Sequence, residues 1–446
     1  MKKKNLMLFA LTISSLTVLA SCGQDKPDKS DGEKTTVELA VEDAMTLTRD
    51  ELFKKAADEL GTSGKLKFLA TTSRGGKDAA KNAFIAELQK HNPGITSPLE
   101  YSSTVDGKIY TTLLAEIENN VKDGYSGAIL QDGYQLGKNL DTFVNYIPKE
   151  WKEATGVNIE RDGDPFALQY NFKTWMANNK NGDTVIDNVW DVTASKYKGK
   201  LDTMDPRNEN VNMDWLIMLT SDEECDKLKA AYEDASNDNK NIDFSTYASY
   251  GEKQKYAYAF IDKFIENAVF HDDDGKAVNK LAQTPGDIGW IVYSKIQNVK
   301  ESEAITKANL VIGALGSDND NGATKGASSM KGFGGFMYKH YPTVMPNAKY
   351  PYATCAFINL LSTTETGYSV WAVDVGDYPT MPSINKNRTK NGYVDGVNKF
   401  PCLNDPTSDW WNDASKGAAV IETPSYIKTK YNSVMAFITR AIAAKQ

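Results

Sequence analysis

The sequence has few of the residues that metal sites and nucleophilic catalysis require. Its 446 residues include three histidines and four cysteines, and neither a CxxC nor an HExxH spacing occurs, so a zinc site would lack its usual ligands. A GxSxG nucleophile motif is absent, and so few histidines give a Ser-His-Asp triad little support. We therefore expect a protein that is not an enzyme, with no catalytic residues, no metal and no cofactor.

Positive charge and long apolar runs are scarce as well. Lys and Arg number 51 against 59 Asp and Glu, which gives a net charge of −8. This acidity argues against nucleic acid and anionic lipid as main partners, because both need a basic face. Beyond the N-terminus, no run is long enough to span a membrane. With 41% hydrophobic residues, the composition is that of a large folded body.

Apolar residues gather at the N-terminus. Lys2 to Lys4 precede an apolar or hydroxylated run from Leu6 to Ala20, which is typical of an export signal. The run ends in Leu-Ala-Ser-Cys, which resembles the lipobox of bacterial lipoproteins. The resemblance implies cleavage before Cys22 and acylation of that residue with chains such as palmitate; a plain secretory cut near Ala20 is the alternative. Residues 23–36 are polar and lack aromatics, which indicates a flexible tether.

Strand-like and helix-like segments alternate from residue 48 onward. A capping box at Thr48–Glu51 predicts the start of a helix. Strands separated by single helices imply a mainly parallel sheet, with helices on both faces and ligand loops at one edge. The spacing of apolar residues predicts strands at 65–70, 99–102, 127–131, 166–175, 199–205, 287–293, 308–315 and 332–338, and helices at 77–91, 106–120, 346–362, 424–444 and over most of 221–282.

Several stretches together resemble a known family. They are ELFKKAADELGTSGKLKFLATTSRGG, FIAELQKHNPGI, GAILQDG, NVWDVTASKYKGKLDTMDP and NAKYPYATCAFINLLSTTETGYSVWAVDVGDYPTMPSIN. In order and spacing they resemble segments of bacterial extracellular solute-binding proteins of the iron- and polyamine-receptor type. The resemblance implies an α/β, two-lobed periplasmic-binding-protein-like fold of type II, with mixed, mainly parallel sheets and flanking helices. It also implies a receptor that captures a small solute between its lobes and delivers it to an ABC permease.

The resemblance also implies where the protein works and how the chain is divided. We expect a monomer that is exported and held by its lipid at the cell membrane, facing outside the cytoplasm at the cell surface or in the periplasm. The parts are the signal peptide (1–21), the lipidated Cys22 with its tether (22–47), lobe 1 (48–168 and a return segment at 330–382), lobe 2 (169–329) and a C-terminal segment packing mainly on lobe 2 (383–446).

Ligand-binding side chains are expected in the loops that follow the strands. Hydroxyl and amide groups in lobe 1 suit an anion or a sugar, and Arg74 could clamp a carboxylate or phosphate. Aromatic faces in lobe 2 suit sugars or cations. For each hydroxyl the alternative is helix capping, and for each aromatic it is core packing. The candidates are Thr72, Ser73, Arg74, Ser103, Thr104, Gln131 and Asp132 in lobe 1, and Tyr170, Asp205, Trp290 and Tyr293 in lobe 2.

The class of solute stays open at this point. Iron-binding members of the family use a His after the first strand, an acidic residue after the third, and two adjacent tyrosines. Here Asp132 follows the third strand, but no His follows the first and Tyr293 has no tyrosine neighbour, which disfavours ferric iron. Asp132, Asp205, Trp290 and Tyr293 would suit a polyamine, although Arg74 opposes a cation. An organic anion, a sugar or a sugar phosphate is equally open.

Two other functions compete with solute capture: a secreted carbohydrate-active hydrolase and a surface adhesin with no small ligand. The segment HDDDGK, residues 271–276, brings a His next to carboxylates. Consecutive loop residues rarely converge on one ion, so a solvated turn is expected there. Cys225, Cys355 and Cys402 are expected to be buried thiols, and at most one pair of them could form a disulfide.

Overall fold

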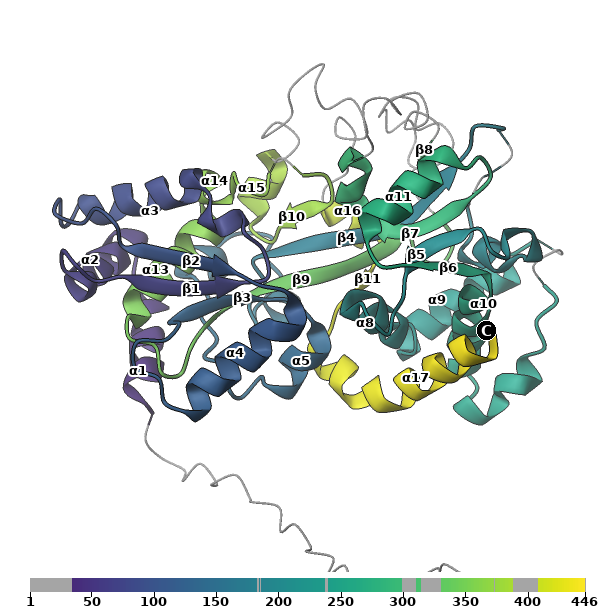
Figure 1. The fold of residues 1–446 in the computed structure, drawn as a ribbon, viewed down its shortest axis with the longest axis horizontal. Helices are drawn as coiled ribbons and strands as arrows, with labels where there is room; N and C mark the ends of the chain where they lie inside the picture. Colours follow the sequence, from purple (N-terminus) through teal and green to yellow (C-terminus); the bar gives the residue numbers. More distant parts are fainter. Residues whose placement is uncertain are drawn as a thin grey trace, which may run out of the picture.

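Two hydrophobic cores lie toward opposite ends of one long sheet (Figure 1). The core of lobe 1 includes Phe68 and Phe357, whose ring centroids lie 5.1 Å apart. The core of lobe 2 includes Trp215 and Trp290, stacked at 4.1 Å. The computed structural model describes residues 34–182, 184, 186–236, 240–298, 310–313, 330–372, 374–387 and 408–445, so Cys22, its lipobox and Cys402 lie outside the described residues.

The sheet has a parallel group at each end and antiparallel strands between them. Its order is β2-β1-β3-β9-β4-β7-β5-β6, with β10 and β8 on β4 and β11 on β9. Strands β2, β1 and β3 are parallel in lobe 1, and β7, β5 and β6 are parallel in lobe 2. This mixed, two-lobed α/β architecture confirms the predicted fold class. The strands are β1 (Leu66–Ala70), β2 (Leu99–Ser103), β3 (Gly127–Leu130), β4 (Gln169–Asn178), β5 (Leu201–Met204), β6 (Ala268–His271), β7 (Ile288–Val292), β8 (Leu310–Ile312), β9 (Gly335–Val344), β10 (Asp377–Pro379) and β11 (Val420–Ile421).

Two long antiparallel strands, β4 and β9, join the lobes. Leu168, just before β4, packs in the core of lobe 1, and Tyr170, the second residue of β4, packs in that of lobe 2. On β9, Tyr338 belongs to the core of lobe 2 and Tyr341 to that of lobe 1. The crossing point is therefore the pair Gln169 and His340, which face each other in the ladder. The return to lobe 1, predicted to begin at residue 330, begins later, at this pair.

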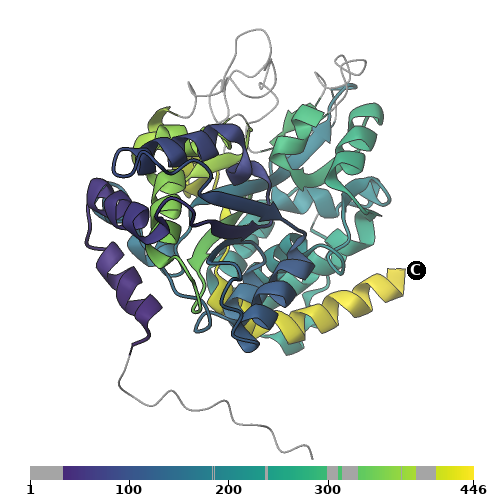
Figure 2. The same cartoon turned by 60° about the vertical axis from the view of Figure 1, so that its left-hand side comes forward.

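The helices of lobe 1 cover both faces of β1, β2 and β3. Helix α2 begins at the predicted capping box, in which the Glu51 backbone N–H reaches the Thr48 hydroxyl. Figure 2 shows α1 and α2, in purple, beside green α13. The helices are α1 (Thr36–Ala44), α2 (Arg49–Leu60), α3 (Asp78–Gln89), α4 (Asp106–Glu118), α5 (Gly133–Lys138), α6 (Lys149–Lys152), α7 (Ile159–Asp162), α13 (Pro351–Thr363), α14 (Glu365–Tyr368) and α15 (Pro382–Asn387), with a 3-10 turn, η1, at Arg74–Gly76.

Helix α1 corrects the predicted extent of the tether. The prediction that residues 22–47 form a flexible tether is wrong from Thr36 onward, because α1 packs its buried face on lobe 1. A capping box between Thr35 and Glu38 starts the helix, and Val37 and Val41 lie on its buried side. This capping box was available in the sequence as Thr-Thr-Val-Glu.

The helices of lobe 2 surround β5, β6 and β7, and the last of them also contacts lobe 1. Helix α17, yellow in Figure 1, starts near α5 and runs along lobe 2 to the C-terminus. Within the described residues, no helix combines the length and apolar character needed to cross a membrane. The helices are α8 (Asn210–Met218), α9 (Asp222–Glu233), α10 (Gln254–Asn267), α11 (Asp274–Gln283), α16 (Ser408–Asn412) and α17 (Pro424–Lys445), with 3-10 turns η2 (Val189–Thr193), η3 (Ser195–Tyr197), η5 (Phe244–Tyr250) and η6 (Tyr293–Asn298).

Candidate functional site

The loop after β3 makes polar contacts with the opposite lobe. Asp132 caps α5 by accepting the Gln135 backbone N–H at 3.0 Å, and it has a positive φ of 77° that a non-glycine residue rarely adopts. Its second carboxylate oxygen accepts the side-chain N–H of Asn210, on α8 of lobe 2, at 2.6 Å. The next backbone N–H, that of Gly133, donates to Asp214 on α8 at 2.8 Å. The two lobes are thus hydrogen-bonded to each other where β3 ends.

Four carboxyl groups gather around this contact, and we call them the carboxyl cluster: Asp106 and Asp132 from lobe 1, Asp214 and Glu422 from lobe 2. Asp106 opens α4 and Glu422 follows β11. Asp132 is 1% exposed, and Asp214 and Glu422 are fully buried. Among the residues that the structure describes, no Lys, Arg or His nitrogen forms an ion pair with any of the four, so their negative charge has no direct counter-ion there.

Burial raises the pKa values of the whole carboxyl cluster. For Asp106, burial followed by the charges of Asp132, Glu209 and Glu422 raises the pKa to about 7. Burial raises the pKa of Asp132 to about 6 and that of Glu422 to about 7, in spite of the hydrogen bonds that both accept. For Asp214, burial and then the charges of Asp132 and Glu422 raise the pKa well above its usual value. Like charges in a dry site favour retained protons or a bound cation.

Two oxygens of the cluster have no hydrogen-bond partner. Glu422 Oε2 accepts the Lys339 backbone N–H at 2.9 Å and the Tyr341 hydroxyl at 2.8 Å, but Oε1 is buried without a partner. Asp214 Oδ1 is buried without a partner in the same way. A methyl group on Gly133 would lie 3.0 Å from Glu422 Oε1 and 3.2 Å from Asp214 Oδ2. Both carboxyl groups therefore converge on the start of α5.

A second polar group lies at the crossing of β4 and β9, and we call it the hinge group: Gln131, Gln169 and His340. The Gln169 amide donates to His340 Nδ1 at 2.8 Å, so Nε2 carries the proton and donates to Gln131 Oε1 at 3.0 Å. Burial, followed by the charge of Arg74, lowers the pKa of His340 to about 4. His340 is therefore neutral at pH 7, and Gln169 Oε1 remains buried without a partner.

Arg74 has structural partners inside lobe 1. Its guanidinium forms an ion pair with Asp374 and donates to the Val370 carbonyl at 3.1 Å. The Arg74 side chain is 25% exposed and that of Asp374 is 19% exposed. These contacts hold the guanidinium within lobe 1, which favours a structural role over the predicted role of Arg74 as a clamp for an anionic ligand.

The other predicted lobe 1 residues lie at the ends of strands or in the loops after them, and within the described part of the chain two of them contact groups beyond lobe 1. Gln131 reaches the hinge group and Asp132 the carboxyl cluster. The Thr72 hydroxyl accepts the Arg74 backbone N–H at 3.3 Å, which is a local turn contact. Ser73 and Ser103 are exposed, and the Thr104 backbone N–H extends the ladder to Ala70.

The predicted lobe 2 residues are placed mostly by packing. Trp290 is fully buried between Trp215 and Trp175, with ring centroids 4.1 Å and 4.5 Å away. Tyr293 is also fully buried and lies edge-on to Trp411. Both aromatics are packed in the core of lobe 2, Trp290 within β7 and Tyr293 at the start of η6, which favours the core-packing alternative over a part in the ligand site.

Tyr170 and Asp205 each have a close partner. The buried Tyr170 hydroxyl donates to Asp162 at 2.5 Å. Asp205 accepts two hydrogen bonds from Arg207 Nε, at 3.0 Å and 3.1 Å, which fixes the loop before α8. The structure therefore does not bring either residue to the carboxyl cluster.

The sequence analysis missed Asp106, Asp214, Glu422 and His340. No local pattern marks them, because they lie on four separate elements and meet only through the topology of the sheet. Asp106 alone carried a signal, since it stands at the start of a predicted helix after a predicted strand, where ligand loops were expected.

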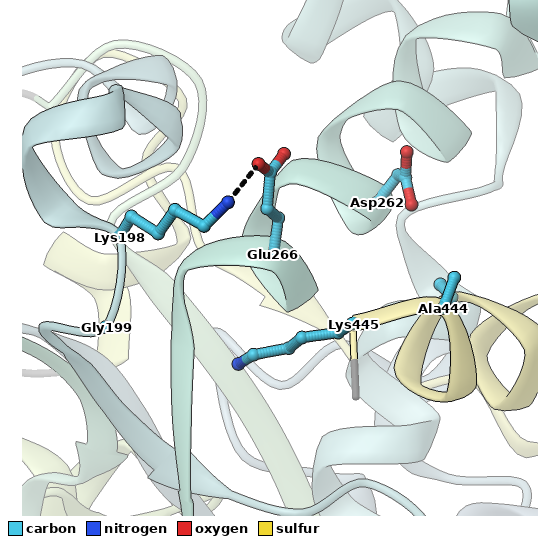
Figure 3. Close-up of a pocket in the computed structure, with 7 residues that line it drawn as sticks. Lys198, Gly199, Asp262, Glu266, Ala444 and Lys445 are labelled. Carbon is cyan, nitrogen blue, oxygen red and sulfur yellow. Dashed lines mark hydrogen bonds and ion pairs between the residues drawn. The ribbon is translucent and has the colours of Figure 1, made fainter.

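A separate pocket of about 450 Å³ lies on lobe 2, away from the lobe junction (Figure 3). It is lined by Lys198 and Glu266, which form an ion pair of 3.1 Å, and by Lys445, which donates to the Ala268 carbonyl. Asp262, which also lines the pocket, accepts the Tyr247 hydroxyl at 2.5 Å, so these polar groups all have partners.

Outside the carboxyl cluster and the hinge group, the described cysteines and acidic residues form no metal site. Cys225 and Cys355 are buried free thiols. His271, in the HDDDGK segment, bonds to the buried Asp202 at 2.7 Å. In the described ranges, no three His, Cys, Asp or Glu side chains are arranged to hold a metal ion.

Comparisons with known proteins identify the fold. No protein family and no curated protein matches the chain by sequence. Its structure resembles iron-bound HitA from Pseudomonas aeruginosa, with a TM-score of 0.52 and 11% identity over 85% of this chain and 99% of that one. A ferric binding protein from Campylobacter jejuni matches with a TM-score of 0.52 and 12% identity, covering 84% of this chain and 99% of that one. An ABC transporter structure from Clostridium perfringens matches with a TM-score of 0.53 and 12% identity, covering 85% of this chain and 100% of that one. At such identities the likeness establishes the fold, and the chain has the predicted two-lobed, type II periplasmic-binding-protein fold.

Proposed function

We propose that this protein is an extracellular solute-binding lipoprotein, which captures a small solute between its lobes and delivers it to an ABC permease without chemical change. The fold supports this proposal, because similar folds are found in ferric binding proteins and an ABC transporter structure. The observation that carries it is the carboxyl cluster with the hinge group. Polar side chains of both lobes meet and are buried at the junction, where the burial of polar groups costs free energy.

The proposed mechanism is closure of the lobes about β4 and β9. These strands are the central link between the cores, and they cross at Gln169 and His340. The contacts of Asp132 with Asn210 and of Gly133 with Asp214 form only when the lobes are together. A solute that touches both lobes adds to these contacts and so shifts the population toward the closed form.

Solute capture is tested by melting the full chain with a panel of amines, carboxylates, phosphates, sugars and ferric citrate. A bound ligand raises the melting temperature by mass action. Small-angle scattering with the same compound should report a smaller radius of gyration as the lobes close. If no compound raises the melting temperature and a glycan is hydrolysed instead, the hydrolase alternative replaces this proposal.

The lipid anchor is proposed separately, because Cys22 lies outside the described residues. Two or more acyl chains would hold the protein at the outer side of the membrane while helix α1 starts the fold at Thr36. Metabolic labelling with radioactive palmitate tests it: the wild-type chain should be labelled and sediment with membranes, and Cys22→Ser should be unlabelled and released. An unlabelled wild-type chain would leave a plain secretory signal as the explanation.

A further inference from the structure

The carboxyl cluster lacks positive charge at a place where the lobes must come together. Asp132 and Asp214 both lie at the contact between α5 and α8, and Glu422 faces the same contact from the end of β11. Glu209, on the loop before α8, adds a fifth carboxylate, but it pairs with Lys173 at 3.2 Å. The remaining four have no such partner among the described residues. Closing the lobes therefore concentrates negative charge in a dry site, which opposes closure unless positive charge arrives.

The unpartnered oxygens show what kind of group is missing. Asp214 Oδ1 and Glu422 Oε1 are acceptors, belong to fully buried side chains, and receive no hydrogen bond. A carboxylate oxygen in this position needs an N–H or O–H donor. A donor that is also cationic satisfies both the hydrogen bond and the charge, and such charge-assisted bonds are about twice as strong as neutral ones.

Among the described residues, the two lysines whose charge acts on Glu422 and Asp132 are Lys339 and Lys138, and both are engaged elsewhere. Lys339 Nζ donates to the Arg161 carbonyl at 2.6 Å and pairs with Asp162 at 3.2 Å. The charge of Lys138, on α5, is the smallest of the effects that lower the pKa of Asp132, and its ammonium lies over the Tyr134 ring. Neither lysine supplies the donor that Asp214 and Glu422 lack.

We infer that the solute carries a protonated primary amino group, and that Asp132, Asp214 and Glu422 bind this ammonium between the lobes. The inference rests on the proposed solute-binding function and names its substrate class. An ammonium presents three N–H donors, which matches acceptors that come from separate carboxyl groups. Residues of both lobes share the ligand, so its binding stabilises the closed form.

The inference is tested by melting and titration calorimetry of the full chain with paired probes. n-Butylamine and 1,4-diaminobutane are compared with 1-butanol and 1,4-butanediol, which have the same length without the charge. We expect the amines to raise the melting temperature and the alcohols to have no effect. Glu422→Gln and Asp214→Asn should weaken amine binding by about 10- to 100-fold, as expected for the loss of a charge-assisted hydrogen bond.

Matched controls separate charge at the cluster from charge in general. Asp141→Asn and Glu118→Gln remove exposed carboxylates of lobe 1 and should leave the amine affinity unchanged. Circular dichroism establishes that each variant is folded, and Asp132→Asn replaces any cluster variant that is not. A shift by succinate, phosphate, ferric citrate or the alcohols but not by the amines would overturn the inference and keep the solute-binding function. A chain that none of these compounds or the sugars stabilises would contradict both.

Discussion

The Gly133 backbone N–H, at the start of α5 in lobe 1, donates a 2.8 Å hydrogen bond to the Asp214 carboxylate on α8 of lobe 2. The junction leaves little room for a side chain at this position. A Cβ on Gly133 would lie 2.9 Å from Ile427 Cδ1, 3.0 Å from Glu422 Oε1 and 3.2 Å from Asp214 Oδ2. These three side-chain ends would have to shift to admit it, so the glycine lets the lobes approach closely.

Gly133→Ala is therefore expected to hinder closure. The overpacked junction should lower the free energy of unfolding by about 1 to 3 kcal/mol and weaken solute binding. Gly107→Ala is the matched control, because nothing lies within 4 Å of its Cβ position on α4. Urea denaturation and small-angle scattering measure the two effects. If Gly133→Ala behaves like Gly107→Ala in both, the lobes do not close against α5.

The pH dependence of stability follows from the raised pKa of Glu422. A carboxyl group with a pKa of about 7 in the fold and about 4.5 when unfolded adds stability that is complete below pH 4.5. That stability is lost as the pH rises through 7. We expect the ligand-free chain to lose about 0.8 kcal/mol between pH 6.5 and 8.5 through Glu422 alone, because most of the loss of about 3 kcal/mol occurs between pH 4.5 and 7. This window lies above the titration of His340, whose pKa is lowered to about 4.

Glu422→Gln isolates this contribution. Asp106, with a pKa of about 7, and the other raised carboxyl groups act in the same direction, so the variant should flatten the decline without abolishing it. Urea denaturation at four pH values measures the slope for each chain. Parallel slopes in the wild type and Glu422→Gln would show that Glu422 ionises normally in the fold.

Local sequence signals accounted for much of the fold. The Thr48–Glu51 capping box and the alternating strands and helices of lobe 1 were confirmed, because they depend on residues close in the chain. Helix α1 was missed although Thr35 and Glu38 form a similar box, since the polar segment before it suggested that the tether continued. The capping box that starts α1 could thus be read from the sequence, although the helix was not predicted.

The candidate site was largely beyond such signals. Asp132 was found because it follows a strand in a predicted parallel sheet, where ligand loops gather. Asp214 lies inside an almost wholly buried helix, and Glu422 follows a two-residue strand, so nothing nearby distinguishes them. Trp290 was chosen because aromatics near strand ends can line ligand sites, but it lies in the middle of β7, which is buried on both faces, and its indole packs in the core.

Arg74 is expected to contribute to the stability of lobe 1 rather than to bind a charged solute. Arg74→Ala removes the ion pair with Asp374 and the hydrogen bond to the Val370 carbonyl. Because both side chains are partly exposed, the loss should be about 2 kcal/mol in the free energy of unfolding. Asp374→Asn should cost a similar amount, and the double variant should cost less than the sum of the two.

A double-mutant cycle by urea denaturation measures this coupling. Solute affinity, determined by calorimetry on the same variants, should change by less than threefold. A large loss of affinity for an anionic solute in Arg74→Ala, with unchanged stability, would return Arg74 to the ligand site.

Trp290 is expected to behave as a core residue. Its indole stacks on Trp215 at 4.1 Å with an interplanar angle of 26° and packs on Trp175 at 4.5 Å. Trp290→Phe leaves part of that space empty, so the free energy of unfolding should fall by about 1 to 3 kcal/mol. Trp410→Phe, at a half-buried indole, is the control and should cost less. Calorimetry on folded Trp290→Phe should give the wild-type affinity, whereas a clear loss of affinity with normal stability would place Trp290 in the solute site.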